Sequence, residues 1–226
     1  MAPELHDPLA AELWAARREA RPIGAVGAID AARGKRIADE LYGALRAGGA
    51  AQVGWKLGFT DAAAQAKFRT DRPFWAPVFD SSVLPGPDLR RSALVAPLLE
   101  AEIAVVTDRQ GTRVAACIEI ADCRFPGWRV SRGEALADFG LQGAMRFGEP
   151  RAGVPDVHVV VRRNDEIVAE GSRPVSAALE LLGWLDAAAR TSLVATGSII
   201  APIPLTPGRW SADFGPLGQL DLEVAP

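Results

Sequence analysis

Residues 98–106 read LLEAEIAVV, and this stretch sets the first expectation for the fold. Side chains of a β-strand point alternately to its two faces, so Glu100 and Glu102 share one face while Leu99 and Ile103 share the other. The two carboxylates would lie roughly 7 Å apart. At that distance two ionised carboxylates repel by roughly 2 kcal/mol at an effective dielectric constant of 20. The pattern indicates either that both glutamates face open water or that a cation lies between them.

A third glutamate occurs on the next predicted strand. Residues 116–120 read ACIEI, and the turn-like sequence DRQG at 108–111 separates them from the first strand. Glu119 would therefore lie on a strand adjacent to Glu100 and Glu102. Three carboxylates form an all-oxygen ligand set, which suits Mg²⁺ or Mn²⁺ and not zinc. The alternative is an amphipathic hairpin whose glutamates face solvent.

Residues 53–59 read VGWKLGF, and the same alternation places Lys56 between Gly54 and Gly58 on one face of a strand. The opposite face, expected to meet the core, carries Val53, Trp55, Leu57 and Phe59. Because glycines leave room beside the lysine, Lys56 is either a residue with space for a ligand or an exposed lysine on an edge strand.

Residues 193–198 read LVATGS, a buried strand that ends in two hydroxyl groups and a glycine. Exposed backbone amides beside hydroxyl groups suit a carboxylate or phosphate oxygen. The alternative is an ordinary turn at the end of a strand.

Composition excludes several classes of protein. The chain has 226 residues, of which 49% are hydrophobic, so it is not globally disordered. Its 25 basic and 28 acidic residues give a net charge of −3, which favours neither nucleic acid nor an acidic membrane as a partner. The chain shows no apolar run long enough to span a membrane and no secretory leader, so we expect a cytoplasmic protein. With only His6 and His158, a Ser-His-Asp triad has little material.

The organisation along the chain predicts an α+β fold, with a helical N-terminal segment (residues 1–50) on a β-rich domain (51–226). Asp7-Pro8 and Asp30 begin two helices in the first segment. Further helices are expected from Ser131, where Glu134 completes a capping box, to about Phe147, and from Pro174 to Arg190. Strands are expected at 51–59, 94–107, 113–121, 157–163, 166–170, 193–200 and 218–224, with a hairpin turn at Asn164-Asp165.

Four short motifs come in a specific order: GWKLGFT at 54–60, EAEI at 100–103, IEIADCR at 118–124 and TGS at 196–198. Together they resemble the 2-keto-4-pentenoate hydratase and 4-oxalocrotonate decarboxylase branch of the fumarylacetoacetate hydrolase superfamily, over about residues 50–224. The resemblance implies a mixed β-roll or barrel with an Mg²⁺ or Mn²⁺ site.

The resemblance also implies roles for individual residues. The metal ligands would be Glu100, Glu102 and Glu119. Lys56 and Asp80 would be catalytic. The substrate would be bound by Gly58, Thr60, Arg124, Thr196, Gly197 and Ser198. One departure falls on the substrate side, where ADFGL at 137–141 replaces the family's ADNAS.

The function implied is a hydratase that adds water to a 2-hydroxy-2,4-dienoate and so forms a 4-hydroxy-2-oxo acid. A decarboxylase of 4-oxalocrotonate-type 2-oxo acids is the first alternative. A C–C hydrolase using His6 and Glu12, and a non-catalytic relative of the same fold, are the others. We expect a homo-oligomer, and association with a related decarboxylase or hydratase is a further expectation.

Overall fold

The fold is that of a computed structural model, which describes residues 4–190 and 192–226. Two helices come first, as predicted: α1 (Pro8–Glu19) and α2 (Ala31–Ala47). The side chain of Asp7 accepts a hydrogen bond from the amide of Leu9, and that of Asp30 accepts one from the amide of Arg33. Each cap satisfies an amide that has no partner at the start of a helix.

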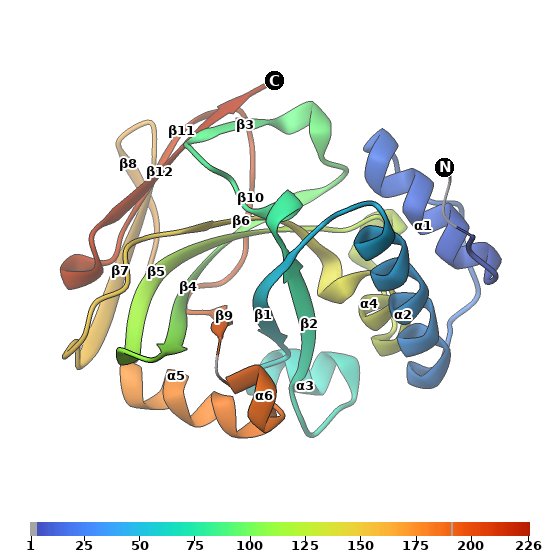
Figure 1. Cartoon of the computed structure of the whole chain (residues 1–226). Coiled ribbons are helices and arrows are strands. Elements are labelled where there is room, and N and C mark those ends of the chain that lie inside the picture. Colours follow the sequence, from blue (N-terminus) through green and yellow to red (C-terminus); the bar gives the residue numbers. More distant parts are fainter. Residues whose placement is uncertain (1–3, 191) are drawn as a thin grey trace.

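The larger of two sheets has seven strands, and β4 (Pro97–Asp108) and β5 (Gly111–Asp122) pair antiparallel near its middle (Figure 1). The order is β2–β1–β9–β4–β5–β6, with β10 paired to β4. The other strands are β1 (Gln52–Gly58), β2 (Phe74–Phe79), β6 (Gln142–Phe147), β9 (Leu193–Ser198) and β10 (Ile203–Pro204).

The second sheet has five strands in the order β3–β12–β11–β7–β8. The predicted hairpin is present, and both turn residues, Asn164 and Asp165, have positive φ angles, as a two-residue hairpin turn of type I′ requires. The strands are β3 (Asp88–Arg90), β7 (Asp156–Arg163), β8 (Glu166–Pro174), β11 (Gly208–Asp213) and β12 (Gln219–Ala225).

The main core lies between the two sheets. Leu99, Ala101 and Ile103 of β4 are fully buried in it, together with side chains of the second sheet such as Val159 and Trp210. The predicted alternation along residues 98–106 is therefore correct. Because the apolar face of β4 is buried against the second sheet, Glu100 and Glu102 face the other side.

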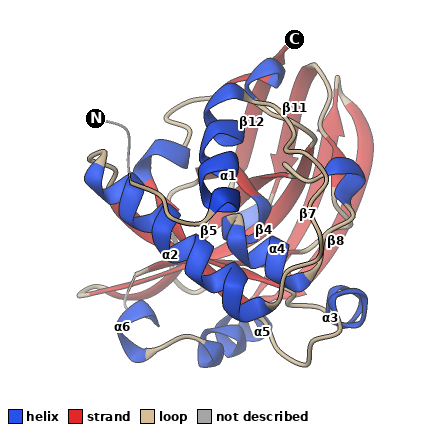
Figure 2. Cartoon of the chain, turned by 90° about the vertical axis from the view of Figure 1, so that its right-hand side faces the viewer, coloured by secondary structure: helices blue, strands red, loops and turns tan. Residues whose placement is uncertain are grey.

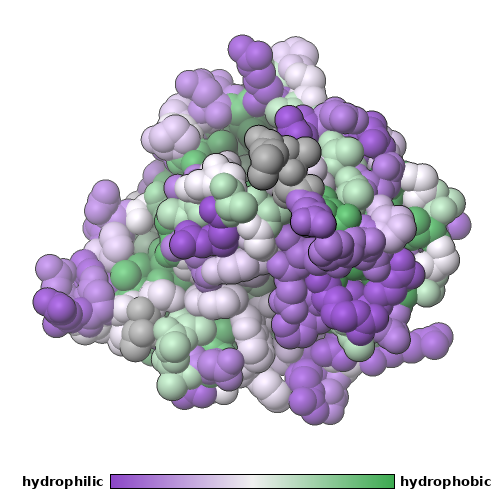
Figure 3. All heavy atoms as spheres, turned by 45° about the vertical axis from the view of Figure 1, so that its right-hand side comes forward, coloured by the Kyte–Doolittle hydropathy of each residue, from purple (hydrophilic) through white to green (hydrophobic). Residues whose placement is uncertain are grey.

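The N-terminal helices share a second core with α4 (Arg132–Ala137) and β2. Figure 2 shows α1, α2 and α4 beside one another, with strands behind them. The outer side of α2 exposes Lys35, Arg36 and Asp39, and Figure 3 shows hydrophilic side chains over much of this face of the molecule. The fold is α+β, with a small helical part on a mostly β body, as predicted. None of the helices within residues 4–190 and 192–226 is long and apolar enough to cross a membrane.

Two predicted helices are shorter than expected. The helix from Ser131 has its capping box but ends at Ala137, because Phe139, Gly140 and Leu141 all adopt positive φ angles. Residues 142–147 then form strand β6. The helix predicted from Pro174 to Arg190 is divided into α5 (Val175–Leu181) and α6 (Ala187–Arg190).

Candidate metal centre and active site

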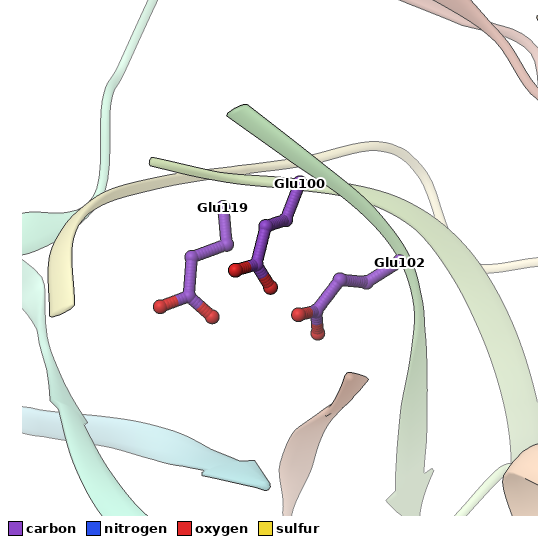
Figure 4. Close-up of side chains that lie close together, drawn as sticks. All are labelled: Glu100, Glu102 and Glu119. Carbon is purple, nitrogen blue, oxygen red and sulfur yellow. The ribbon is translucent and has the colours of Figure 1, made fainter. Parts of the chain in front are cut away.

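Glu100, Glu102 and Glu119 direct their carboxylates into one space (Figure 4). One oxygen of each lies within 4.8 Å of those of the other two. The strand register explains this arrangement, because Glu119 on β5 is directly opposite Glu100 on β4, and Glu102 follows two residues later on the same face. Glu102 and Glu119 are fully buried and Glu100 is half-buried, so these are not the solvent-facing glutamates of an amphipathic hairpin.

The surroundings of the carboxylates disfavour their ionised forms. Burial and the charge of Glu119 raise the pKa of Glu100 to about 7. Burial, with the charges of Glu119 and Glu100, raises the pKa of Glu102 well above its ordinary value. Oε1 of Glu102 and Oε2 of Glu119 are buried and have no hydrogen-bond partner within the described part of the chain. Buried carboxylate oxygens without a partner are costly unless something binds them, and a cluster of three carboxylates suits a divalent cation.

Lys56 reaches the same cluster from β1. The residue is 4% exposed, and Nζ donates hydrogen bonds to Oε1 of Glu119 and, at 3.1 Å, to the carbonyl of Gly140. Burial favours the neutral amine, but the charges of Glu119, Glu100 and Glu102 outweigh this effect and raise the pKa of Lys56. Lys56 is therefore a buried cation beside the carboxylates and not an exposed lysine of an edge strand.

The glycines beside Lys56 serve a purpose other than the one predicted. A Cβ atom on Gly54 would lie 2.5 Å from the carbonyl oxygen of Leu193, and one on Gly58 would lie 2.3 Å from the ring of Phe74. Their lack of side chains thus permits close packing against Leu193 and Phe74. The prediction that the opposite face meets the core is also partly wrong, since Val53 on that face is exposed.

The segment Thr196-Gly197-Ser198 forms a bulge at the end of β9. Ala195 is opposite Ala104 and Ser198 is opposite Glu102, so Thr196 and Gly197 together face the single residue Ile103. The hydroxyl of Thr196 donates to the carbonyl of Ile103 (2.8 Å) and the amide of Gly197 donates to Oε2 of Glu102 (2.9 Å). Both groups, predicted to bind the substrate, are already engaged by the protein. Ser198 remains half-buried at the edge of the cluster.

Arg173 of β8 is a site residue that the sequence analysis missed. Its guanidinium donates to the carbonyls of Thr196 (3.3 Å), Gly197 (2.7 Å) and Ser198 (2.6 Å). No local pattern around residue 173 indicates this contact, because β8 belongs to the other sheet.

Arg124, predicted to bind the substrate, is engaged by buried partners within the protein, and its role in substrate binding stays a prediction. Its guanidinium is 3% exposed and bonds to Asp138 (2.6 Å), Asp122 (3.2 Å) and the carbonyl of Gln142 (2.9 Å). Arg17 of α1 also pairs with Asp138, at 2.7 Å. These residues form a buried chain of ion pairs that joins the N-terminal helices to the sheet.

Asp80 is also not brought to the cluster. It is exposed, and Oδ1 accepts hydrogen bonds from the amides of Ser81 (2.7 Å) and Ala51 (3.0 Å). It follows Phe79, which pairs with Gln52, at the opposite end of the β1–β2 pair from Gly58. Its carboxylate therefore fixes a turn and makes no contact with Lys56.

Thr60 lies at the edge of the site, where its side chain packs against Gly197. A Cβ atom on Gly197 would be 2.1 Å from Oγ1 of Thr60, and Gly197 has a φ of 87°. Asp61, which caps α3 (Ala62–Phe68), is close enough that its charge contributes to the raised pKa of Glu100. Binding of the substrate by Gly58, Thr60 and Ser198 stays a prediction.

No protein-family model and no curated protein matches the sequence. Comparison with solved structures shows that the chain has the fold of the fumarylacetoacetate hydrolase superfamily, as the four motifs predicted. It is similar to 4-oxalocrotonate decarboxylase from Pseudomonas putida G7 complexed with magnesium and adipate (TM-score 0.85, 23% identity, 96% of this chain and 95% of that chain). The complex of that enzyme with calcium and acetate gives a TM-score of 0.81 at 22% identity, with the same coverage.

A more distant match is 5-carboxymethyl-2-hydroxymuconate delta-isomerase from Mycobacterium smegmatis (TM-score 0.52, 16% identity, 77% of this chain and 79% of that chain). The similarity to the decarboxylase thus extends over almost the entire length of both chains, including the N-terminal helices.

Proposed function

We propose that this chain is a divalent-metal-dependent decarboxylase of a 2-oxo dicarboxylic acid of the 4-oxalocrotonate type. The observation that carries the proposal is the buried trio of glutamates with Lys56, set in a fold that matches a 4-oxalocrotonate decarboxylase over 96% of the chain. That enzyme's complex contains magnesium and adipate, a six-carbon dicarboxylate. The sequence favoured a hydratase, and the structural comparison favours the decarboxylase that was its first alternative.

Glu100, Glu102 and Glu119 would hold the cation, which is Mg²⁺ or Mn²⁺ by the chemistry of an all-oxygen ligand set. A bound divalent cation supplies positive charge to the 2-oxo and carboxylate oxygens of the substrate and withdraws electron density from the carbon chain. Among the oxygens available for it are two that are fully buried and have no hydrogen-bond partner within the described residues, Oε1 of Glu102 and Oε2 of Glu119.

Lys56 supplies the proton for the reaction. In decarboxylation the bond between the terminal carboxyl group and the adjacent carbon breaks, and its electron pair moves along the conjugated chain to the 2-oxygen. Carbon dioxide leaves, and one proton is taken up to give the 2-hydroxydienoate. Because the pKa of Lys56 is raised, Nζ carries a proton at neutral pH and can donate it at the 2-oxygen.

The site supports the other two enzymatic candidates unequally. A C–C hydrolase would use His6 and Glu12, but His6 is exposed and Glu12 pairs with Arg21 at 2.7 Å. A hydratase needs the same chelation and a water molecule directed at C4 of the substrate. The same glutamates and Lys56 serve that reaction, so the hydratase is the second candidate.

An assay of products distinguishes these activities. The purified chain is incubated with Mg²⁺ and either 4-oxalocrotonate or 2-hydroxypenta-2,4-dienoate, and the products are identified by mass spectrometry. We expect carbon dioxide release from the dicarboxylate, abolished by EDTA and restored by Mg²⁺ or Mn²⁺. Addition of water to the dienoate without carbon dioxide release from the dicarboxylate would identify a hydratase. Turnover of neither, with metal bound, would identify a non-catalytic relative.

We propose a cytoplasmic homo-oligomer that acts on a small acid released by a preceding step of aromatic-compound breakdown. Size-exclusion chromatography with light scattering tests the oligomer, and co-purification tests association with a related hydratase.

A further inference from the structure

The bulge at the end of β9 leaves three consecutive carbonyl groups to be satisfied. Thr196 and Gly197 are displaced from regular pairing with β4, because both lie opposite Ile103. Backbone carbonyls in a buried segment need donors. A single guanidinium, that of Arg173, donates to the carbonyls of Thr196, Gly197 and Ser198. The planar fork of arginine suits this task, whereas the ammonium of a lysine is a single point of charge.

The same bulge holds one of the candidate metal ligands. The amide of Gly197 donates to Oε2 of Glu102 at 2.9 Å, while the carbonyl of Gly197 accepts from Arg173 at 2.7 Å. Arg173 and Glu102 therefore bind the same residue from two sides. With Oε2 engaged, Oε1 of Glu102 is the oxygen that lies buried without a partner among the described residues, beside the other two glutamates.

The backbone of β8 is shaped for this contact. Gly171, two residues before Arg173 on the same face of the strand, lies so close to the chain after the bulge that a Cβ atom would be 2.7 Å from the carbonyl oxygen of Ile199. β8 is the edge strand of the smaller sheet, and β9 belongs to the larger one. Gly171 and Arg173 thus join the two sheets at the candidate metal centre.

We propose that Arg173 is a positioning residue for the metal centre: it fixes the bulge at residues 196–198, and the bulge fixes the carboxylate of Glu102. This inference rests on the metal centre of the proposed function. Partners that orient a metal ligand typically affect metal affinity by 10- to 100-fold when they are removed. A residue that only stabilises the fold would lower the melting temperature when replaced. Replacement of a positioning residue should in addition weaken metal binding.

The test compares Arg173→Met, Arg173→Lys and a matched control, Arg91→Met, in the full chain. Arg91 is also half-buried and also donates to two backbone carbonyls, those of Leu94 (2.8 Å) and Val95 (3.2 Å). Mg²⁺ and Mn²⁺ affinities are measured by titration calorimetry on metal-free protein, and hydrogen–deuterium exchange follows the peptide that contains residues 193–199. We expect Arg173→Met to weaken metal binding about 10-fold or more and to speed exchange at this peptide, with a smaller effect of Arg173→Lys. Arg91→Met should lower the melting temperature only.

Unchanged metal affinity in Arg173→Met, or an equal loss in Arg91→Met, would overturn the inference. If Arg173→Met does not fold, Gly171→Ala provides the second variant. Its methyl group would press on Ile199, and it should weaken metal binding several-fold, while unchanged affinity would count against the inference. A chain that binds Mg²⁺ but releases no carbon dioxide would refute the proposed function, and the comparison of affinities would still decide the role of Arg173.

Discussion

The ammonium group of Lys56 donates a hydrogen bond to the carboxylate of Glu119, although 63 residues separate them in the sequence. Their strands, β1 and β5, are not neighbours in the sheet, since β9 and β4 lie between them. Curvature of the sheet brings the two side chains together inside it, where both are about 5% exposed or less. In the metal-free chain Lys56 therefore supplies counter-charge that a divalent cation supplies in a loaded site.

This arrangement predicts that Lys56 opposes metal binding while it supports the reaction. Replacing it with Met removes one positive charge beside the three carboxylates, so the affinity for Mg²⁺ should increase by about 10-fold or more. In the Mg²⁺-bound protein kcat should fall strongly, because the proton donor is lost, while the melting temperature should change little. Calorimetry and a carbon dioxide assay test this, with the exposed Lys67→Met as control. Weaker Mg²⁺ binding in Lys56→Met would show that the lysine does not compete with the metal.

The glutamates should be required individually for metal binding. Glu102→Gln and Glu119→Gln each remove a ligand charge but keep the size of the side chain, so we expect the affinity for Mg²⁺ to fall about 100-fold. Glu166→Gln, at the exposed β7–β8 turn, should bind normally. Full metal binding by either of the first two variants would place the cation elsewhere.

The stability of the metal-free chain should decrease as the pH rises. The pKa of Glu100 is raised from 4.5 to about 7, so the folded chain holds a proton that the unfolded chain has released. This contribution is fully present below about pH 4.5 and is lost as the pH rises to about 7. In EDTA, the melting temperature should therefore fall between about pH 5 and pH 7.5.

Mg²⁺ should reverse this trend, because the cation binds the ionised carboxylates. Glu100→Gln should weaken the pH dependence in EDTA, since the variant cannot release that proton, and the raised pKa of Glu102 leaves a remainder of the same sign. A melting temperature that rises with pH across this range, in EDTA, would mean that other groups dominate.

The sequence predicted the parts of the site that depend on local alternation. The period of two along 98–106 and 116–120 placed the three glutamates on one face, and the short turn between the strands placed them opposite each other. The prediction failed for Phe139 to Leu141, where a tertiary contact outweighs helix periodicity: the carbonyl of Gly140 accepts from Lys56 and the strand that follows completes the sheet. β2 and β11 were missed because their prolines, glycines and polar residues obscure the strand pattern.

Arg124 and Arg173 show the limit of motif reasoning. Arg124 is the last residue of the motif at 118–124 that resembles the family's. Asp122 and Asp138 nevertheless engage it, and no spacing in the sequence reveals that Asp138 lies nearby. Arg173 carries no motif, and its partners lie on a strand of the other sheet. In both cases the contact depends on how distant elements pack.

The buried ion pairs of Arg124 should be structural. Arg124→Met would leave Asp138 with Arg17 alone, and breaking a buried pair from one side typically costs about 3–5 kcal/mol. We expect a large fall in the free energy of unfolding with unchanged Mg²⁺ affinity at temperatures where the variant is folded. Denaturant unfolding and calorimetry measure the two quantities. A loss of substrate affinity without loss of stability would instead support the predicted role of Arg124 in substrate binding.

Gly140 should be needed for the reaction, through its contact with Lys56. It has a φ of 66°, and a Cβ atom would lie 2.5 Å from the ring of Phe74 and 3.5 Å from Cε of Lys56. Phe139 and Leu141 are buried in the N-terminal core, so the backbone cannot move freely to relieve the contact. Gly140→Ala should therefore displace the carbonyl that orients Lys56.

The matched control is Gly127→Ala, because Gly127 has the same φ of 66° but no atom within 4 Å of the added methyl group. Both variants should lose about 1–2 kcal/mol of stability from the left-handed backbone alone. Gly140→Ala should lose more than this and should lower kcat about 10-fold or more, with Mg²⁺ affinity changed less than kcat. If kcat falls equally in the two variants, the effect comes from backbone strain and the carbonyl of Gly140 does not orient Lys56.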